Sequence, residues 1–257
     1  MSRRIPPWKD CWIWGRDSHS PSQYMQFLHR FDAGQGDGFT LEISADTNYA
    51  CWLNGRFAGF GQYADFPEHK FYDAIDIGQY VRKGENTLAV LAYYCGTDTS
   101  TYARGVPMVA FLVKEGDKTA AVSSGETLCR PAKGYRQGEM ELVTPQMGYP
   151  FFYDAREDDS WNTPDYRPGD GWEPACPVVP ALLEDMEPRP VDKLPILPPC
   201  TARIQAQGLF FRTGRGKTLA EQFYYDYLSP VERKELFAND RVVSLPCKEG
   251  LVLKKAA

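Results

Sequence analysis

The sequence has little of what marks a membrane protein or a nucleic-acid-binding protein. No stretch of its 257 residues approaches the ~20 apolar residues that a transmembrane helix needs. Residues 1–12 hold two arginines but no apolar core, so we expect no secretory signal peptide. Lysine and arginine do not cluster, and the formal net charge is −5. We therefore expect neither a nucleic-acid partner nor a membrane partner.

Cysteine occurs without the spacing of a disulfide framework or a zinc site. The seven cysteines are odd in number, lie far apart and include no C-x-x-C pair. We expect reduced thiols in a cytoplasmic protein, with the buried ones acting as small hydrophobic residues. His29 has no metal-ligand partner spaced near it and is expected to be structural or on the surface. No cofactor is predicted.

The composition that is present favours a β protein. Aromatic residues make up 14% of the chain, and 20 prolines and 22 glycines suit turn-rich strands better than helices. From residue 41 onward apolar and polar residues alternate, which predicts a half-buried strand with Leu41, Ile43 and Ala45 on its core face. Glu42, Ser44 and Asp46 then fall on the opposite face.

Residues 49–94 add a hairpin and a central strand. Asn54-Gly55 between two apolar runs predicts a type I′ turn, which needs positive φ at both central residues. Residues 87–94 are apolar on both faces, so we expect this strand to be central and covered on both sides. With further strands predicted at 24–31, 71–77, 108–113 and 119–123, the pattern indicates an antiparallel β-sandwich.

Several motifs carry a family resemblance. They are the W-I-W segment at 12–14, FYDAIDIGQYVRKGENTLAVLAYY at 71–94, YDAR at 153–156 followed by Trp161 and Trp172, and the proline-rich E-P-R-P-V and L-P-I-L-P-P between 187 and 199. Together they resemble the N-terminal β-sandwich region of bacterial α-L-rhamnosidases, glycoside hydrolase family 78. The resemblance covers about residues 8–255 and implies a galactose-binding-like jelly roll.

The resemblance and the composition also predict how the chain is divided. We expect a jelly-roll β-sandwich over 1–178, a proline-rich linker over 179–200, and part of a second β-sandwich over 201–257. Within that last part we expect strands at 201–211, 242–245 and 251–253, a helical or mixed patch at 217–227, and a short helix at 231–237.

Two long loops of the expected sandwich offer sugar-binding chemistry, residues 60–70 and 95–107. Aromatic faces stack on sugar C–H groups, and charged side chains hydrogen-bond hydroxyls. The predicted carbohydrate-binding residues are Tyr63, Asp65, His69, Asp98, Tyr102 and Arg104. The spacing does not show whether the two loops share one end of the sandwich. The alternative for 60–70 is docking on a neighbouring domain, with Phe66 and Pro67 packed underneath.

Three consecutive acids, Glu157, Asp158 and Asp159, raise the question of glycosidase chemistry. A catalytic carboxylate pair needs two separate environments, one for a protonated acid and one for an ionised group, and neighbouring loop acids do not supply them. We expect solvated acids here. Calcium stays open as an alternative because oxygen-rich loops can hold it, but no D-x-D-x-D-G loop is present and no ligands are predicted.

The sequence thus leads to three functional hypotheses. The first is a non-catalytic carbohydrate-binding or substrate-positioning region of an α-L-rhamnosidase-like glycoside hydrolase, for which the resemblance implies rhamnose-containing glycans. The second is a purely structural or dimerisation module that braces a downstream catalytic domain or a second chain. The third is an independent hydrolase, which needs a buried carboxylate pair that no sequence motif indicates. In the family the catalytic acids lie in a helical barrel that no segment here matches, so no catalytic residue is predicted.

Overall fold

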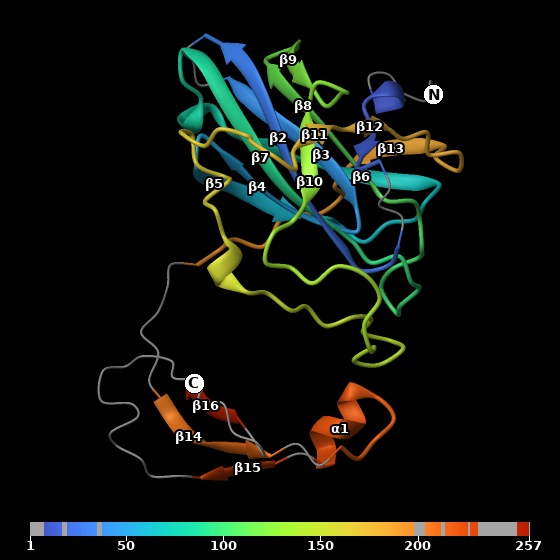
Figure 1. The fold of residues 1–257 in the computed structure, drawn as a ribbon. Helices are drawn as coiled ribbons and strands as arrows, with labels where there is room; N and C mark the ends of the chain where they lie inside the picture. Colours follow the sequence, from blue (N-terminus) through green and yellow to red (C-terminus); the bar gives the residue numbers. More distant parts are fainter. Residues whose placement is uncertain are drawn as a thin grey trace. The chain divides into compact units, whose positions relative to one another are not determined.

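The computed structural model describes residues 8–16, 20–34, 38–197, 204–211, 214–225, 227–230 and 251–256. The chain divides into two compact units, which are described separately: residues 1–140 with 145–192, and residues 141–144 with 193–257. The first unit holds two β-sheets packed face to face (Figure 1). The described residues of the second unit include a small sheet and the helix α1.

One layer of the sandwich, sheet A, has the strand order β12-β1-β8-β3-β6-β13, with β9 paired to β8. Its neighbouring strands are antiparallel except β13, which lies parallel to β6. The strands are β1 (Ile13–Trp14), β3 (Phe39–Asp46), β6 (His69–Asp76), β8 (Met108–Glu115), β9 (Lys118–Val122), β12 (Cys176–Pro177) and β13 (Asp185–Pro188).

The other layer, sheet B, has the order β11-β10-β2-β7-β4-β5 and is antiparallel throughout. Its strands are β2 (Gln23–Ala33), β4 (Asn48–Leu53), β5 (Arg56–Gly61), β7 (Gly84–Tyr94), β10 (Leu128–Pro131) and β11 (Glu173–Pro174). Short 3-10 turns occupy Trp8–Asp10, Gly78–Tyr80 and Ala155–Glu157. The predicted all-β sandwich is confirmed, and β7 is a central strand as expected.

The β4–β5 hairpin has the turn that the sequence predicts. Asn54 and Gly55 both have positive φ, 51° and 77°. The Asn54 side chain also fixes the hairpin to the next segment, because its Oδ1 accepts from the Thr87 backbone N–H at 3.0 Å and its Nδ2 donates to Asn86 Oδ1 at 2.8 Å. The turn residue therefore sets both the conformation of the hairpin and its register against β7.

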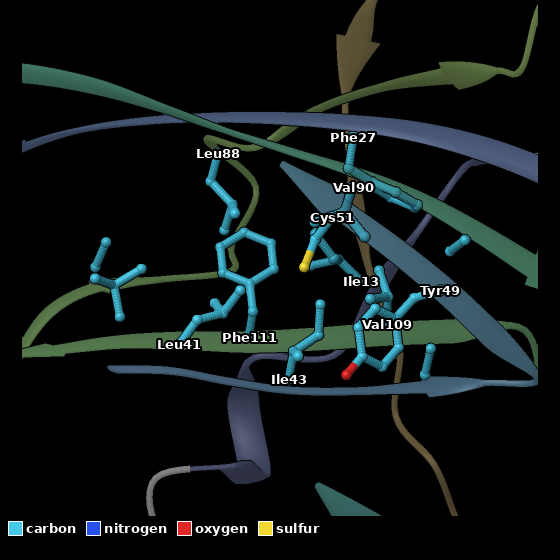
Figure 2. Packing of buried hydrophobic residues seen from close by; sticks show 14 of the residues in the cluster. Ile13, Phe27, Leu41, Ile43, Tyr49, Cys51, Leu88, Val90, Val109 and Phe111 are labelled. Atoms are coloured by element: carbon cyan, nitrogen blue, oxygen red, sulfur yellow. The ribbon is translucent and has the colours of Figure 1, made fainter. Parts of the chain in front are cut away.

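The main core lies between the two sheets. Each strand contributes every second side chain to this layer, as the period-2 pattern requires. Figure 2 shows the packed side chains: Phe27, Tyr49, Cys51, Leu88 and Val90 from sheet B, and Ile13, Leu41, Ile43, Val109 and Phe111 from sheet A.

The outer face of sheet B is covered by the segment 151–175. Trp161 packs on Ala89 of β7 and Leu28 of β2, which explains why β7 is apolar on both faces. The buried Arg130 side chain holds this segment to the sheet, since its Nη2 donates to Asp159 at 2.7 Å and its guanidinium lies 4.5 Å from the Trp172 ring centroid. Asp159 is therefore no solvated loop acid, and that expectation was wrong for this residue. Glu157 and Asp158 are exposed as expected.

The outer face of sheet A is covered as well. Trp8 and Trp12 pack against Met186 of β13 and against Met108 and other apolar residues of β8. Ser44 and Asp46, which the alternation assigned to the outer face of a half-buried strand, are 0% and 1% exposed. The alternation predicted the correct face of the strand for each side chain. It did not predict that other segments of the chain would cover the outer face.

The second unit contains β15-β14-β16 and α1. Strands β14 (Ile204–Phe211), β15 (Tyr227–Pro230) and β16 (Leu251–Ala256) form an antiparallel sheet, and α1 spans Leu219–Tyr225. The strands expected at 201–211 and 251–253 and the helical patch at 217–227 agree with these elements. The helix expected at 231–237 and the strand at 242–245 lie outside the described residues.

Several sequence expectations concern single residues. His29 is buried, and its Nδ1 lies 2.9 Å from Thr127 Oγ1, so it is a structural histidine. Among the cysteines that the structure describes, Cys11, Cys95, Cys129 and Cys176 carry free thiols. Within the described ranges, no helix has both the length and the apolar character for a membrane crossing.

We predict that Asp159→Asn lowers the stability of the sandwich in a pH-dependent way. Burial raises the pKa of Asp159, but hydrogen bonds from Arg130 and Lys133 outweigh it and lower the pKa to about 2. A depressed folded-state pKa stabilises the fold above the unfolded value near 4, and that contribution disappears as the pH falls toward 2. Because solvent screens a partly exposed carboxylate, we expect a loss of about 1 kcal/mol at pH 7.

The measurement is urea unfolding of both proteins from pH 7 to pH 2. The stability difference should shrink as the pH falls below 4. Glu157→Gln is the matched control, because it removes one carboxylate from the same segment at an exposed position. A difference that is constant with pH, or an equal loss in the control, would contradict the prediction.

Candidate functional site

A small polar cavity of about 170 Å³ lies where β3 ends and the loops after β5 and β7 meet. We call it the acidic pocket, since its only lining residues with a formal charge are two aspartates. The lining residues are Asp46, Thr47, Asn48, Gln62, Tyr63, Ala64, Asp65, Thr101 and Tyr102.

Behind the wall of this pocket lies a buried lysine. The ammonium of Lys70 donates to Asp46 Oδ1 at 2.9 Å and to Asp65 Oδ1 at 2.8 Å. The three side chains are 2%, 1% and 5% exposed, so the ion pairs are shielded from bulk water. Ion pairs at this depth are stabilised only when the geometry is good and the remaining oxygens are hydrogen-bonded.

The remaining carboxylate oxygens are in fact satisfied. Asp46 Oδ2 accepts from the Tyr102 hydroxyl at 2.8 Å. Asp65 Oδ2 accepts from Gln62 Nε2 at 2.8 Å and from the Phe71 backbone N–H at 3.1 Å. Each oxygen of the two carboxylates therefore has a donor, and the donors come from three different segments. A carboxylate has about four lone-pair positions, so both groups can still accept from a ligand.

Backbone geometry explains why the loop 95–107 reaches Asp46. The Tyr102 hydroxyl accepts from the Gly105 N–H at 3.2 Å, and the Gly105 carbonyl accepts from the Tyr94 hydroxyl at 3.1 Å. A Cβ on Gly105 would lie 3.1 Å from Asp46 Oδ2, tighter than most real contacts. Glycine therefore allows the loop to pass directly over the carboxylate.

The electrostatics of the cluster follow from burial and from the shared cation. Burial alone would lower the pKa of Lys70, but the two carboxylates outweigh it and raise the pKa above its usual value. Burial raises the pKa of Asp46 and of Asp65, and the lysine opposes that rise. The lysine is thus firmly protonated at neutral pH, with both aspartates bound to the same charge.

The structure brings three of the six predicted sugar-binding residues together. Tyr63 and Asp65 come from the loop 60–70, Tyr102 comes from the loop 95–107, and all three line the acidic pocket. The two loops therefore meet at one end of the sandwich. Spacing could not show this, because it depends on the register of β3 against β6 and β8.

The other three predicted residues lie elsewhere. His69 faces Asp185 and Glu187 of β13, at 3.7 and 3.8 Å. Asp98 shapes its own loop, since its Oδ1 accepts from the Arg104 backbone N–H at 2.7 Å. None of these side chains lines the acidic pocket.

Arg104 instead lines a second, more apolar cavity of about 350 Å³, together with Val106, Met108 and residues 179–182. Pro67 of the loop 60–70 also lines this groove, but Phe66 is 61% exposed. The alternative in which the loop 60–70 docks on a neighbouring domain, with Phe66 and Pro67 packed underneath, stays open.

Sequence reasoning missed Asp46, Lys70 and Gln62. Asp46 was assigned to the outer face of a half-buried strand. Lys70 and Gln62 fall within the loop 60–70 but were not among the residues selected from it. The one signal available was the position of Asp46 at the end of its strand, where the chain enters a loop. A lysine becomes buried between two acids through contacts between distant segments, so no pattern in the neighbouring sequence predicts it.

The proline-rich segment contributes to the wall of the pocket. Arg189 Nε donates to the buried carboxylate of Asp73 at 2.5 Å, and its guanidinium lies 5.0 Å from the centroid of the Tyr63 ring. The edge of the Phe71 ring packs on the same tyrosine at 5.2 Å. Tyr63 is therefore held between β6 and the segment that follows β13.

This arrangement suits binding better than hydrolysis. Both carboxylates share one lysine, so their environments are not separated into a protonated acid and an ionised base. Over the described ranges, no group of three or more His, Cys, Asp or Glu residues has the geometry of a metal site. What the pocket offers is carboxylate acceptors for hydroxyl groups beside two tyrosine rings.

Comparison with known proteins gives different results for sequence and structure. No protein-family model matches the sequence, and no curated protein is significantly similar to it. By structure the chain is similar to a GH78 family rhamnosidase of Bacillus sp. GL1, with 28% identity and a TM-score of 0.67, over 80% of this chain and 22% of that one.

Two more distant enzymes share the fold. The α-L-rhamnosidase from Dictyoglumus thermophilum has 20% identity and a TM-score of 0.55, over 79% of this chain and 24% of its own. The α-L-rhamnosidase from Aspergillus terreus has 14% identity and a TM-score of 0.52, over 78% and 26%.

The chain thus spans about a quarter or less of the length of these enzymes. In the part of the chain that the structure describes, the only α-helix has seven residues, so a helical catalytic barrel is not among the described elements. The fold of this chain is similar to that of part of a GH78 family rhamnosidase, as its sequence motifs implied.

Proposed function

We propose that this chain is a non-catalytic, carbohydrate-binding region that positions substrate for an α-L-rhamnosidase-like glycoside hydrolase. The observation that carries the proposal is the acidic pocket, in which two loops join buried carboxylates and two tyrosines around a cavity of about 170 Å³. We also propose that residues 1–178 form the binding domain and 201–257 part of a second β-sandwich. The proline-rich linker 179–200 would join them, with its strand β13 paired to β6 of the sandwich.

The chemistry of the pocket fits a sugar residue. Sugar hydroxyls donate well to carboxylates, and Asp46 and Asp65 keep lone pairs for them. Asn48 and Thr101 are exposed residues of the lining and add an amide and a hydroxyl. The cavity is smaller than the 300 Å³ or more of drug-sized ligand sites, which favours one sugar residue at a time.

The proposed ligand is a rhamnose-containing glycan. Similarity to a rhamnosidase at 28% identity supports this class of ligand.

A structural role is the second candidate, and the second groove favours it. Three apolar residues of that groove are strongly exposed: Val106 at 42%, Leu182 at 66% and Val179 at 85%. Exposed apolar clusters of this kind mark contact surfaces for another domain or chain. A bracing module of this type would bind no sugar of its own, so sugar binding separates the two candidates.

We predict that Tyr63→Ala and Tyr102→Ala each weaken binding of rhamnose-containing oligosaccharides. Loss of one aromatic contact should lower the affinity by roughly three- to tenfold. The measurement is isothermal titration calorimetry, with the melting temperature recorded for each variant. Arg104→Ala is the control, because this residue lies in the other groove and should leave the affinity unchanged. Unchanged affinity in both tyrosine variants would place the binding site elsewhere.

We further predict that the pocket favours neutral sugars over uronates. Two aspartates and one lysine give the cluster a net charge of −1, and the carboxylates, not the ammonium, line the cavity. A uronate should therefore bind about tenfold or more weakly than the neutral sugar of the same ring stereochemistry. Ligand-observed NMR with matched pairs at low salt tests this. Equal binding within a pair would contradict the prediction, and the preference should fade in Asp65→Asn.

A further inference from the structure

We propose that Lys70 is a positioning residue that takes the place of a bound metal cation, so that the acidic pocket binds its ligand without a divalent ion. The part about the ligand rests on the proposed function. The part about the cation rests on the cluster alone and can be tested without any sugar.

The first step is the position of the ammonium. Lys70 Nζ lies 2.9 Å from Asp46 Oδ1 and 2.8 Å from Asp65 Oδ1, and its side chain is 2% exposed. Two carboxylates that converge on one buried point need a positive charge there, because like charges at this separation cannot otherwise both stay ionised. In oxygen-rich loops that charge is often Ca²⁺. Here the chain supplies it from strand β6.

The second step is what the ammonium leaves open. It takes up only the Oδ1 atoms, while Asp46 Oδ2 and Asp65 Oδ2 are oriented by Tyr102 and Gln62. The ammonium thus holds one oxygen of each carboxylate in place. Lys70 is not itself among the residues that line the cavity. A ligand would contact the carboxylates and never the lysine.

The third step is that the lysine joins separate segments. Asp46 ends β3, Asp65 lies in the loop 60–70, and Tyr102 brings the loop 95–107 to the same carboxylate. These are the segments whose meeting creates the pocket. A metal ion in a loop site acts in this way, by ordering ligands from distant parts of the chain.

The experiment has two arms. In the first, wild-type protein is treated with EDTA or with 2 mM CaCl₂, and its melting temperature and its affinity for a rhamnose-containing oligosaccharide are measured. We expect no change in either quantity. A drop in melting temperature or in affinity with EDTA would overturn the proposal. If wild type binds no sugar under any condition, the proposed function and the ligand part of this inference fail together, while the cation part is still decided by the second arm.

In the second arm, Lys70→Ala removes the built-in cation. We expect a lower melting temperature that CaCl₂ raises more than NaCl does at the same ionic strength, since the two carboxylates then face an open space. The matched control is the double variant with Lys70→Ala and Asp65→Asn, in which the calcium-specific rise should be absent. Equal responses to CaCl₂ and NaCl in Lys70→Ala, or an unchanged melting temperature, would overturn the proposal.

Lys70→Ala alone can fail to fold, because it leaves two buried carboxylates without their counter-charge. A triple variant with Lys70→Met, Asp46→Asn and Asp65→Asn then decides the question. If charge compensation is the role of the lysine, the uncharged triple variant should fold where Lys70→Met does not, as judged by circular dichroism and cooperative melting. Failure of both to fold would show that Lys70 is needed for packing, and would overturn the proposal.

Discussion

The pairing of one buried lysine with two buried aspartates is the interaction on which the candidate site depends. The side chains of Lys70, Asp46 and Asp65 are at most 5% exposed, so each charge is stable only while the others are in place. Removal of one partner from such a cluster typically costs about 3–5 kcal/mol, a large part of the stability of a domain. The loops that bear these residues are therefore held in one arrangement, and the pocket is largely formed before any ligand arrives.

Burial of Asp46 follows from a second constraint, the loop 95–107, which places the Tyr102 hydroxyl on the carboxylate and Gly105 directly over it. Both sheets of the sandwich are also covered on their outer faces. Trp8, Trp12 and β13 cover sheet A, and the segment 151–175 covers sheet B. Without the loop 95–107, Asp46 would be open to water, where an ion pair contributes little. With the loop in place, the same residue lies in a low-dielectric environment and its interactions are stronger.

The sequence predicted the sandwich well because its signals are local. Alternation from Leu41, the Asn54-Gly55 turn and the two-sided apolar run at 87–94 each reflect the geometry of a strand or a turn. The site was predicted only in part. Tyr63, Asp65 and Tyr102 stand in loops and have side chains that suit sugars, so composition was enough to select them.

The members of the site that were missed depend on contacts between distant segments. Asp46 and Lys70 are 24 positions apart, and Tyr102 is 56 positions from Asp46. Their meeting requires that β3 pair with both β6 and β8 in a fixed register, which no local pattern specifies. His69 and Asp98 show the converse case, since they were predicted for the site but do not line the acidic pocket. Both have suitable side chains in suitable loops, but neighbouring backbone or strand β13 already engages them.

Sugar binding would rule out a purely structural role but not the docking of a neighbouring domain, because the acidic pocket and the second groove share one structural element. Arg189 follows β13 directly, where it binds Asp73 and lies over the ring of Tyr63, a wall of the acidic pocket. A few residues earlier, Val179 and Leu182 expose apolar side chains at the second groove. A domain that docks on this groove would contact the same proline-rich segment that holds Tyr63. The residues before β13 would then contact the neighbouring domain, and Arg189 after β13 would hold the tyrosine that contacts the sugar. One continuous stretch of chain would thus serve both roles.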